Sequence, residues 1–192
     1  MEVKPVTLEG KVVRLEPLAE RHAADLAVAA SADLFDYHFP PAELTEAGFA
    51  EQIRSLSSLP DWCPFATVLR ADGRCVGITC YLDIRPAHRG LEIGFTWIGK
   101  AWQASAVNPE AKLLQLGHTF ETLGAVRVQL KTDVRNLQSQ NALEKLGAVR
   151  EGVLRKQMVL PDGYVRDTVM YAITDEDWPR VRVGLEERLR AC

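Results

Sequence analysis

The chain has 192 residues, 47% of them hydrophobic, and 23 Lys and Arg oppose 26 Asp and Glu for a formal charge of -3. This length can bury a full core without disulfides or metals, so we expect one domain over residues 1–192 and no nucleic-acid partner bound through a basic surface. Without a bilayer-length apolar run or a signal-peptide core, the sequence predicts a cytoplasmic protein with no membrane partner.

The expected elements alternate between strands and helices, as in a mixed α/β domain. In the first part of the chain the apolar patterns predict strands over 11–15, 64–70, 75–83 and 91–98, and helices over 19–30 and 42–56. In the second part they predict a helix from about 108, a strand over 126–131, a helix over 137–146, a hairpin of 149–160 with 164–173, and a last helix from about 175. Tight turns are expected at 71–73 and 161–163, where Asp precedes Gly.

Small residues crowd the turn that enters the helix near residue 108. A ligand can approach the backbone there, and the unpaired N–H groups of a first helical turn attract anions. Asn108 is a favoured N-cap, Pro109 suits the first helical position, and Glu110 suits the positive end of the helix dipole. We therefore expect a phosphate-binding turn, with Glu110 adding local repulsion that Lys100 and Lys112 could offset.

Several motifs follow one another at fitting distances. The pyrophosphate-loop pattern of Arg or Gln, two residues, Gly, one residue, Gly or Ala falls on Gln103, Ala106 and Asn108, with both small positions altered. A second pattern matches at Asn136, Ser139, Leu146 and Gly147, and the segment 91–95 matches a central strand. The chain thus resembles the GNAT (Gcn5-related) N-acetyltransferases and, within them, the ribosomal-protein N-terminal acetyltransferase branch, over nearly its whole length.

This resemblance implies an α/β (α+β) fold with a mixed, mostly antiparallel sheet of about seven strands, flanked by helices and with splayed central strands. It also implies acetyl-CoA as the cosubstrate, with its pyrophosphate over Gln103, Ala104, Ser105, Ala106, Val107 and Asn108. The pantetheine arm would follow the strand edge of Thr96, Trp97 and Ile98, where the N–H of Ile98 or a neighbour could polarise the thioester carbonyl.

Three polar residues are candidates for the chemistry. Glu92 is a carboxylate within an apolar strand and could take the proton of an incoming ammonium; the alternative is a strand glutamate paired with a cation. By resemblance, Ser139 could protonate the leaving sulfur, or simply hydrogen-bond at the helix start. Asn136 is expected to contact pantetheine, cap the helix, or do both. Family members often place a tyrosine where this chain has Leu143.

The segment 33–41 lies where the resembled enzymes admit the acceptor. Its candidate substrate contacts are Phe35, Tyr37, His38 and Phe39, although the two phenylalanines could equally pack into the core. No His or Cys spacing suggests a metal, and the cysteines are expected to be reduced structural thiols.

The sequence therefore predicts an N-acetyltransferase that moves acetyl from acetyl-CoA to a primary amine by direct attack. The acceptor could be a protein N-terminus, or a small amine such as an antibiotic, amino acid or polyamine. A non-catalytic acyl-CoA-binding or sensor domain is the alternative from another class. As the resembled branch implies, the C-terminal hairpin and helix could form a homodimer surface, with Val159, Val165 and Val169 as its strand residues.

Overall fold

In the computed structural model, which describes residues 1–37 and 39–191, the strands join into one open sheet. Within this described part the sheet has eight strands in the order β1-β2-β3-β4-β5-β6-β8-β7. Only β5 and β6 run parallel; every other neighbouring pair is antiparallel. The expected mixed, mostly antiparallel GNAT-like sheet is confirmed, and the strand beyond the expected seven is the two-residue β1.

The elements follow the predicted order closely. The strands are β1 Leu8–Glu9, β2 Val13–Pro17, β3 Cys63–Leu69, β4 Cys75–Arg85, β5 Gly90–Ile98, β6 Arg127–Asp133, β7 Val149–Val159 and β8 Val165–Thr174. The α-helices are α1 Ala23–Ala29, α2 Glu46–Ser57, α3 Val107–Gly117, α4 Leu137–Leu146 and α5 Trp178–Arg190. The expected turns at 71–73 and 161–163 are confirmed, each with a glycine at positive φ.

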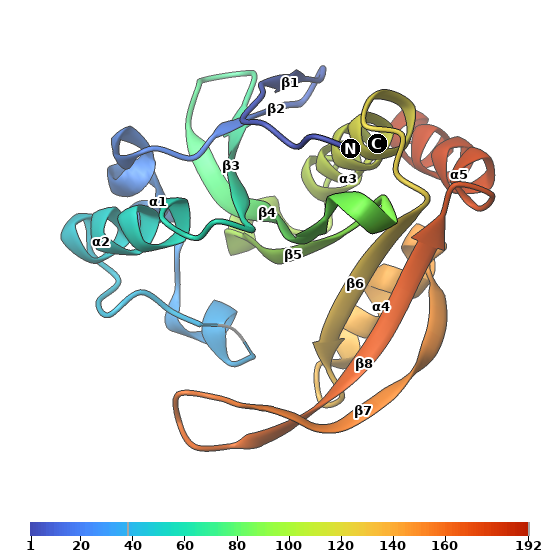
Figure 1. Ribbon diagram of the computed structural model, residues 1–192. Helices are drawn as coiled ribbons and strands as arrows, with labels where there is room; N and C mark the ends of the chain where they lie inside the picture. The colour runs from blue at the N-terminus through green and yellow to red at the C-terminus, as the bar shows by residue number, and fades with distance from the viewer. Residues whose placement is uncertain (38, 192) are drawn as a thin grey trace.

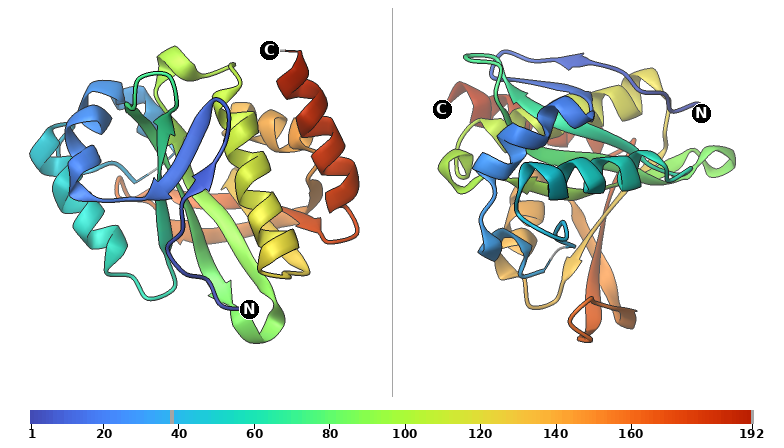
Figure 2. Two further views of the ribbon diagram at one scale, coloured as in Figure 1. Left: turned by 90° about the horizontal axis from the view of Figure 1, so that it is seen from above. Right: turned by 90° about the vertical axis from the view of Figure 1, so that its left-hand side faces the viewer.

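The helices cover the sheet from two sides. The helices α1 and α2 pack on one face of the first half of the sheet, and α3 and α5 lie on the other (Figures 1 and 2). Two buried clusters result: one centred on Phe49, Ile78 and Trp97 beneath α1 and α2, and one centred on Leu91, Leu116 and Tyr171 beneath the other helices. The sheet therefore separates two packed layers of apolar side chains.

A gap opens in the sheet between the central strands β5 and β6. Their parallel pairing covers only Gly90 to Glu92 against Arg127 to Gln129. Beyond it, Phe95 adopts a left-handed φ of 49° at a register shift against β4, which bends β5 away from its neighbour. β6 instead continues with β8, so the two halves of the sheet diverge as a V (Figure 1). The expected splayed central strands are thus confirmed.

The helix after this gap begins two residues earlier than its expected N-cap and first helical residue, Asn108 and Pro109, predict. Its N-cap is Ala106, not Asn108, and Pro109 lies at the third helical position. Proline is tolerated there because none of the first-turn N–H groups has an intrahelical partner. The next helix, α4, has the predicted bounds, with Asn136 as its N-cap and Gly147 at φ 95° after its last turn.

Among the described residues, Cys63, Cys75 and Cys80 are buried free thiols, which agrees with their expected structural role, and Cys192 lies outside the described residues. Burial raises the pKa of Cys75 to about 12, so this thiol is unreactive. None of the helices seen in residues 1–37 and 39–191 combines the length and the hydropathy that a membrane crossing requires.

Candidate active site

The gap between β5 and β6 exposes a strand edge that no other strand of residues 1–37 and 39–191 covers. Gly99 N–H donates to the Val76 carbonyl at 2.8 Å, so these residues form a hydrogen-bonded antiparallel pair. In the same register, Gly77 and Ile98 form the next, non-hydrogen-bonded pair, and the N–H of Ile98 therefore points away from β4. This donor faces the gap, while the backbone of Trp97 is paired with β4.

Side chains tie the turn between β5 and α3 into a fixed shape. Gln103 donates from Nε2 to the carbonyl of Ile98 at 3.0 Å, and Ser105 Oγ donates to the Trp102 carbonyl at 2.6 Å. Ala104 adopts a left-handed φ of 53°, which turns successive N–H groups toward one side of the turn. Gln103, Ala104 and Ser105 are exposed, and Val107 is buried in the core. The turn thus presents backbone donors where a pyrophosphate could lie.

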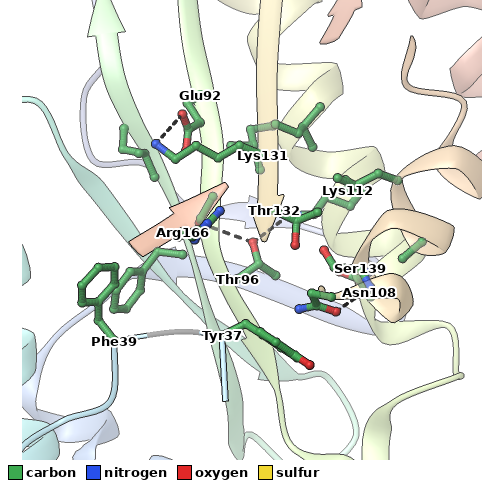
Figure 3. A pocket seen from close by; sticks show the side chains of 18 of the residues that line it. Tyr37, Phe39, Glu92, Thr96, Asn108, Lys112, Lys131, Thr132, Ser139 and Arg166 are labelled. Atoms are coloured by element: carbon green, nitrogen blue, oxygen red, sulfur yellow. Dashed lines mark hydrogen bonds and ion pairs between the residues drawn. The ribbon is translucent and has the colours of Figure 1, made fainter. Parts of the chain in front are cut away.

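A cavity of about 280 Å³ occupies the gap, and side chains of α3 and α4 form one of its walls (Figure 3). Asn108, Asn136 and Ser139 all line it. Asn136 Oδ1 accepts the N–H of Ser139 at 2.9 Å, so Asn136 caps α4 while bordering the cavity. The Oδ1 of Asn108 is buried and accepts no hydrogen bond from any described residue. A buried acceptor without a hydrogen bond that faces a cavity suits a ligand with amide N–H donors, such as pantetheine.

Lys112 also lines the cavity, in a position that the sequence did not suggest. Only 6% of this residue is exposed, and its Nζ donates to Thr79 Oγ1, Thr96 Oγ1 and Gln115 Oε1 at 3.0–3.1 Å. All three partners are neutral, and burial lowers the pKa of Lys112 to about 7. The lysine expected to offset charge at the turn is therefore directed inward, while Lys100 pairs with Asp33.

This buried lysine makes stability depend on pH in a defined direction. The unfolded lysine keeps its proton up to about pH 10.5, whereas the folded one loses it near pH 7, so the unfolded state binds more protons between these values. The free energy of unfolding should therefore rise with pH in this window by up to about 1.4 kcal/mol per pH unit, relative to Lys112→Met. Urea unfolding at several pH values measures this slope. Equal slopes in the two proteins would contradict the burial of a titrating amine.

Glu92 lies where the two strands separate. It is 1% exposed, accepts a hydrogen bond from Gln129 Nε2 at 2.9 Å and pairs with Lys131 Nζ at 3.1 Å (Figure 3). The cation that pairs with it is thus Lys131 of the neighbouring strand. The carboxylate remains part of the cavity wall, where it could receive a proton.

The candidate acceptor residues divide between core and cavity. Phe35 is buried and packs edge-on against Trp97 at 5.5 Å between ring centroids, whereas Tyr37 and Phe39 line the cavity. His38 lies outside the described residues. The side chain of Trp97 belongs to the core under α1 and α2, and its backbone pairs with Ile78 of β4.

Two arginines near the cavity were absent from the sequence-based candidates. Arg135 pairs with the buried Asp133 at 2.8 Å and stacks on Tyr164, 3.4 Å from the ring centroid. Arg166, in β8, lines the cavity and is itself buried. In this strand every second residue lies on the same face, so Arg166 shares a face with Thr168 and Met170. This alternation is the sequence pattern that could have indicated the direction of the Arg166 side chain. Residues 1–37 and 39–191 contain no group of three side chains able to hold a metal.

The comparisons with known proteins agree with this geometry. The family model described as "Acetyltransferase (GNAT) domain" matches residues 13–149. The chain belongs to the GNAT acetyltransferases. It is an acyltransferase of a family that uses acetyl-CoA and acts on amines, and the sequence-based resemblance to the GNAT family is confirmed.

Individual relatives cover different shares of the chain. A GCN5-related N-acetyltransferase from Brucella melitensis is 30% identical, with a TM-score of 0.90 over 97% of this chain and 86% of that one. RimJ of Mycobacterium smegmatis, in complex with CoA-disulfide, is 23% identical with a TM-score of 0.81 over 96% and 95%, and shows the fold alone. The probable N-acetyltransferase YjcK of Bacillus subtilis is 30% identical over 59% of this chain, and the match spans 62% of YjcK.

Proposed function

We propose that this GNAT enzyme binds acetyl-CoA across the gap between β5 and β6 and transfers the acetyl group to a primary amine held beside Glu92. The observation that carries the proposal is the open edge of β5, where the Ile98 N–H has no strand partner within the described part of the chain. This donor suits the thioester carbonyl, and the buried Asn108 Oδ1 suits a pantetheine amide. Glu92 would take the proton of the amine, and Ser139 would lie near the leaving sulfur.

The proposed pyrophosphate position can be tested at Ala106. Its N–H belongs to the turn that presents backbone donors, and an acidic side chain there would repel a phosphate and obstruct its approach. We expect Ala106→Glu to weaken acetyl-CoA binding about tenfold or more, with Ala106→Gln as the uncharged control of the same shape. Calorimetry on folded variants measures the affinity. An unchanged affinity in Ala106→Glu would rule out this turn as the binding site.

The acceptor must reach a carboxylate that is almost fully buried. Only an amine at the end of a slender chain can do so, which is compatible with a protein N-terminal amino group, as the resemblance implies, or with a small-molecule amine. The cavity of about 280 Å³ favours the small molecule, because little room remains for a peptide once an acetyl group is present. Tyr37 and Phe39 would contact either acceptor at the rim.

A panel of amines and N-terminal peptides, scored for thiol release from acetyl-CoA, tests this function. The proposal predicts release that depends on at least one primary amine, with the acetyl group recovered on that amine. Tight acetyl-CoA binding without release on any amine would instead support a binding or sensor domain, which the altered pyrophosphate motif suggests as the alternative.

The proposed homodimer rests on the C-terminal hairpin. Val159 and Val165 are 65% and 45% exposed near the tip of β7 and β8, as a contact surface requires. Val169 is fully buried, so the expectation that it lines this surface is wrong. Light scattering at micromolar concentration would detect the dimer, and a monomeric mass would eliminate it.

A further inference from the structure

Arg166 is a buried cation to which the described structure gives no partner. Only 6% of the residue is exposed, its Nε is buried without an acceptor, and no described carboxylate lies within ion-pair distance of its guanidinium. A guanidinium stays protonated in proteins, and removing such a charge from water without a partner is costly. Arg166 lines the cavity, so a ligand that enters the cavity can supply this partner (Figure 3).

The nearest acidic side chains are already engaged. Asp133 accepts hydrogen bonds from the backbone N–H, Nε and Nη2 of Arg135 at 2.8–3.0 Å. Glu92 is held by Lys131 and Gln129. Burial lowers the pKa of Arg166 although the charges of Asp133 and Glu92 act in the opposite direction. Neither carboxylate therefore forms an ion pair with Arg166.

Arg166 is also on the side of the sheet where the amine is proposed to enter. β6 and β8 pair with Lys131 opposite Met170 and Asp133 opposite Thr168, so these side chains share one face. Arg166 precedes Thr168 by two residues and therefore lies on the same face, which is the face of the Glu92–Lys131 pair. Val128, Leu130 and Val169 of these strands belong instead to the core under the other helices.

We propose that Arg166 binds a carboxylate carried by the acceptor, which makes the acceptor an amino carboxylate rather than a polyamine, an aminoglycoside or a neutral peptide end. The inference rests on the proposed function, because it assigns the second polar group of the same acceptor. The planar guanidinium matches a carboxylate with two parallel hydrogen bonds, and the low dielectric of the cavity strengthens this pairing. An amine without an anionic group would leave the guanidinium unpaired.

Sets of matched acceptors test this assignment. Leucine, γ-aminobutyrate and ε-aminocaproate vary the separation of amine and carboxylate, and each is compared with its amide and with the alkylamine that lacks the carboxyl group. Phosphoethanolamine distinguishes phosphate from carboxylate, and a peptide with a neutral N-terminal residue represents protein substrates. We expect kcat/KM for at least one amino acid to exceed that of its amide and alkylamine by roughly 30-fold or more.

The preference should depend on Arg166. In Arg166→Gln, KM for the preferred amino acid should rise roughly 30-fold or more while the rate with its alkylamine is unchanged, and Arg166→Lys should restore part of the preference. Arg155→Gln removes an exposed arginine of the neighbouring strand β7 and should change neither value. Unchanged acetyl-CoA affinity establishes that Arg166→Gln is folded. A fall of equal size for amino acid and alkylamine would mean that Arg166 acts through packing alone.

Other outcomes separate this inference from the proposed function. Three outcomes would overturn the carboxylate assignment while the acetyltransferase proposal holds. They are equal rates for amino acids and their amides, a preference for phosphoethanolamine, and faster acetylation of the neutral peptide. If no amine is acetylated, the proposed function fails, and calorimetry with N-acetylleucine in the presence of CoA then decides the assignment. Binding to the wild type but not to Arg166→Gln would support it, and binding to neither would overturn it.

Discussion

Replacing Glu92 by glutamine should lower turnover with the preferred amine by roughly a hundredfold or more, the usual scale for loss of general-base assistance. The substitution keeps the shape of a side chain that is 1% exposed and removes only its charge and its ability to hold a proton. Acetyl-CoA affinity should stay unchanged, because the proposed cosubstrate contacts come from β5, α3 and α4. Steady-state kinetics with the amine, together with calorimetry for acetyl-CoA, measure both effects.

The matched control is Glu151→Gln, which removes a carboxylate that pairs with Arg127 on the exposed side of β7. Its turnover should equal that of the wild type. If Glu92→Gln also turns over at the wild-type rate while chemistry limits the reaction, the enzyme must rely on positioning and on an amine that arrives already neutral. Glu92 would then be only the partner of Lys131.

Replacing Glu110 by alanine should lower the free energy of unfolding by about 3 kcal/mol or more, because three buried or half-buried donors lose a charged acceptor. The Glu110 carboxylate accepts the backbone N–H groups of Lys11, Val12 and Val13 at 2.6–2.9 Å. These bonds tie the turn between β1 and β2 to α3. A Cβ added at Gly10 would lie 2.5 Å from Glu110 Oε2, which shows how closely the turn encloses this carboxylate.

Urea unfolding measures this loss, and Glu9→Ala is the control. Glu9 forms only an exposed ion pair with Arg70, so its removal should cost less than about 1 kcal/mol. The expectation that Glu110 repels a phosphate at the turn is not supported by this geometry. Glu110→Gln should therefore leave acetyl-CoA affinity unchanged. A tighter complex in this variant would show that the carboxylate does face the pyrophosphate.

Local patterns predicted the elements of the fold well. The turns at Gly73 and Gly163 and the end of α4 at Gly147 depend on backbone conformations that neighbouring residues specify, so short segments reveal them. The start of α3 was misplaced because a proline fits at any position of the first turn. The splay between β5 and β6 came from family resemblance, since the left-handed Phe95 that bends β5 carries no local signal.

The directions of charged side chains were harder to predict. Glu110 and Lys112 adjoin the same turn, yet they have different partners. Glu110 accepts backbone N–H groups about a hundred residues away, at the β1–β2 turn and the start of β2. Lys112 donates to Thr79 of β4 and Thr96 of β5, as well as to Gln115 of its own helix. The role proposed for Arg166 depends on Asp133 and Glu92, which bond to other cations in the folded chain. Such roles depend on which groups the fold brings together, and spacing along the chain does not encode them. The candidates Glu92, Asn136 and Ser139 do line one cavity. The catalytic roles of Glu92 and Ser139 and the pantetheine contact of Asn136 remain predictions.

Amide hydrogen exchange at residue resolution, with and without acetyl-CoA, tests the central claim that the cosubstrate lies along the open edge of β5. Exchange at the Ile98 N–H should slow on binding, together with the N–H groups of residues 104–106, because these donors gain acceptors. Exchange at Trp97 should hardly change, since its N–H already pairs with β4. Protection that omits Ile98 and appears elsewhere on the protein would contradict this account.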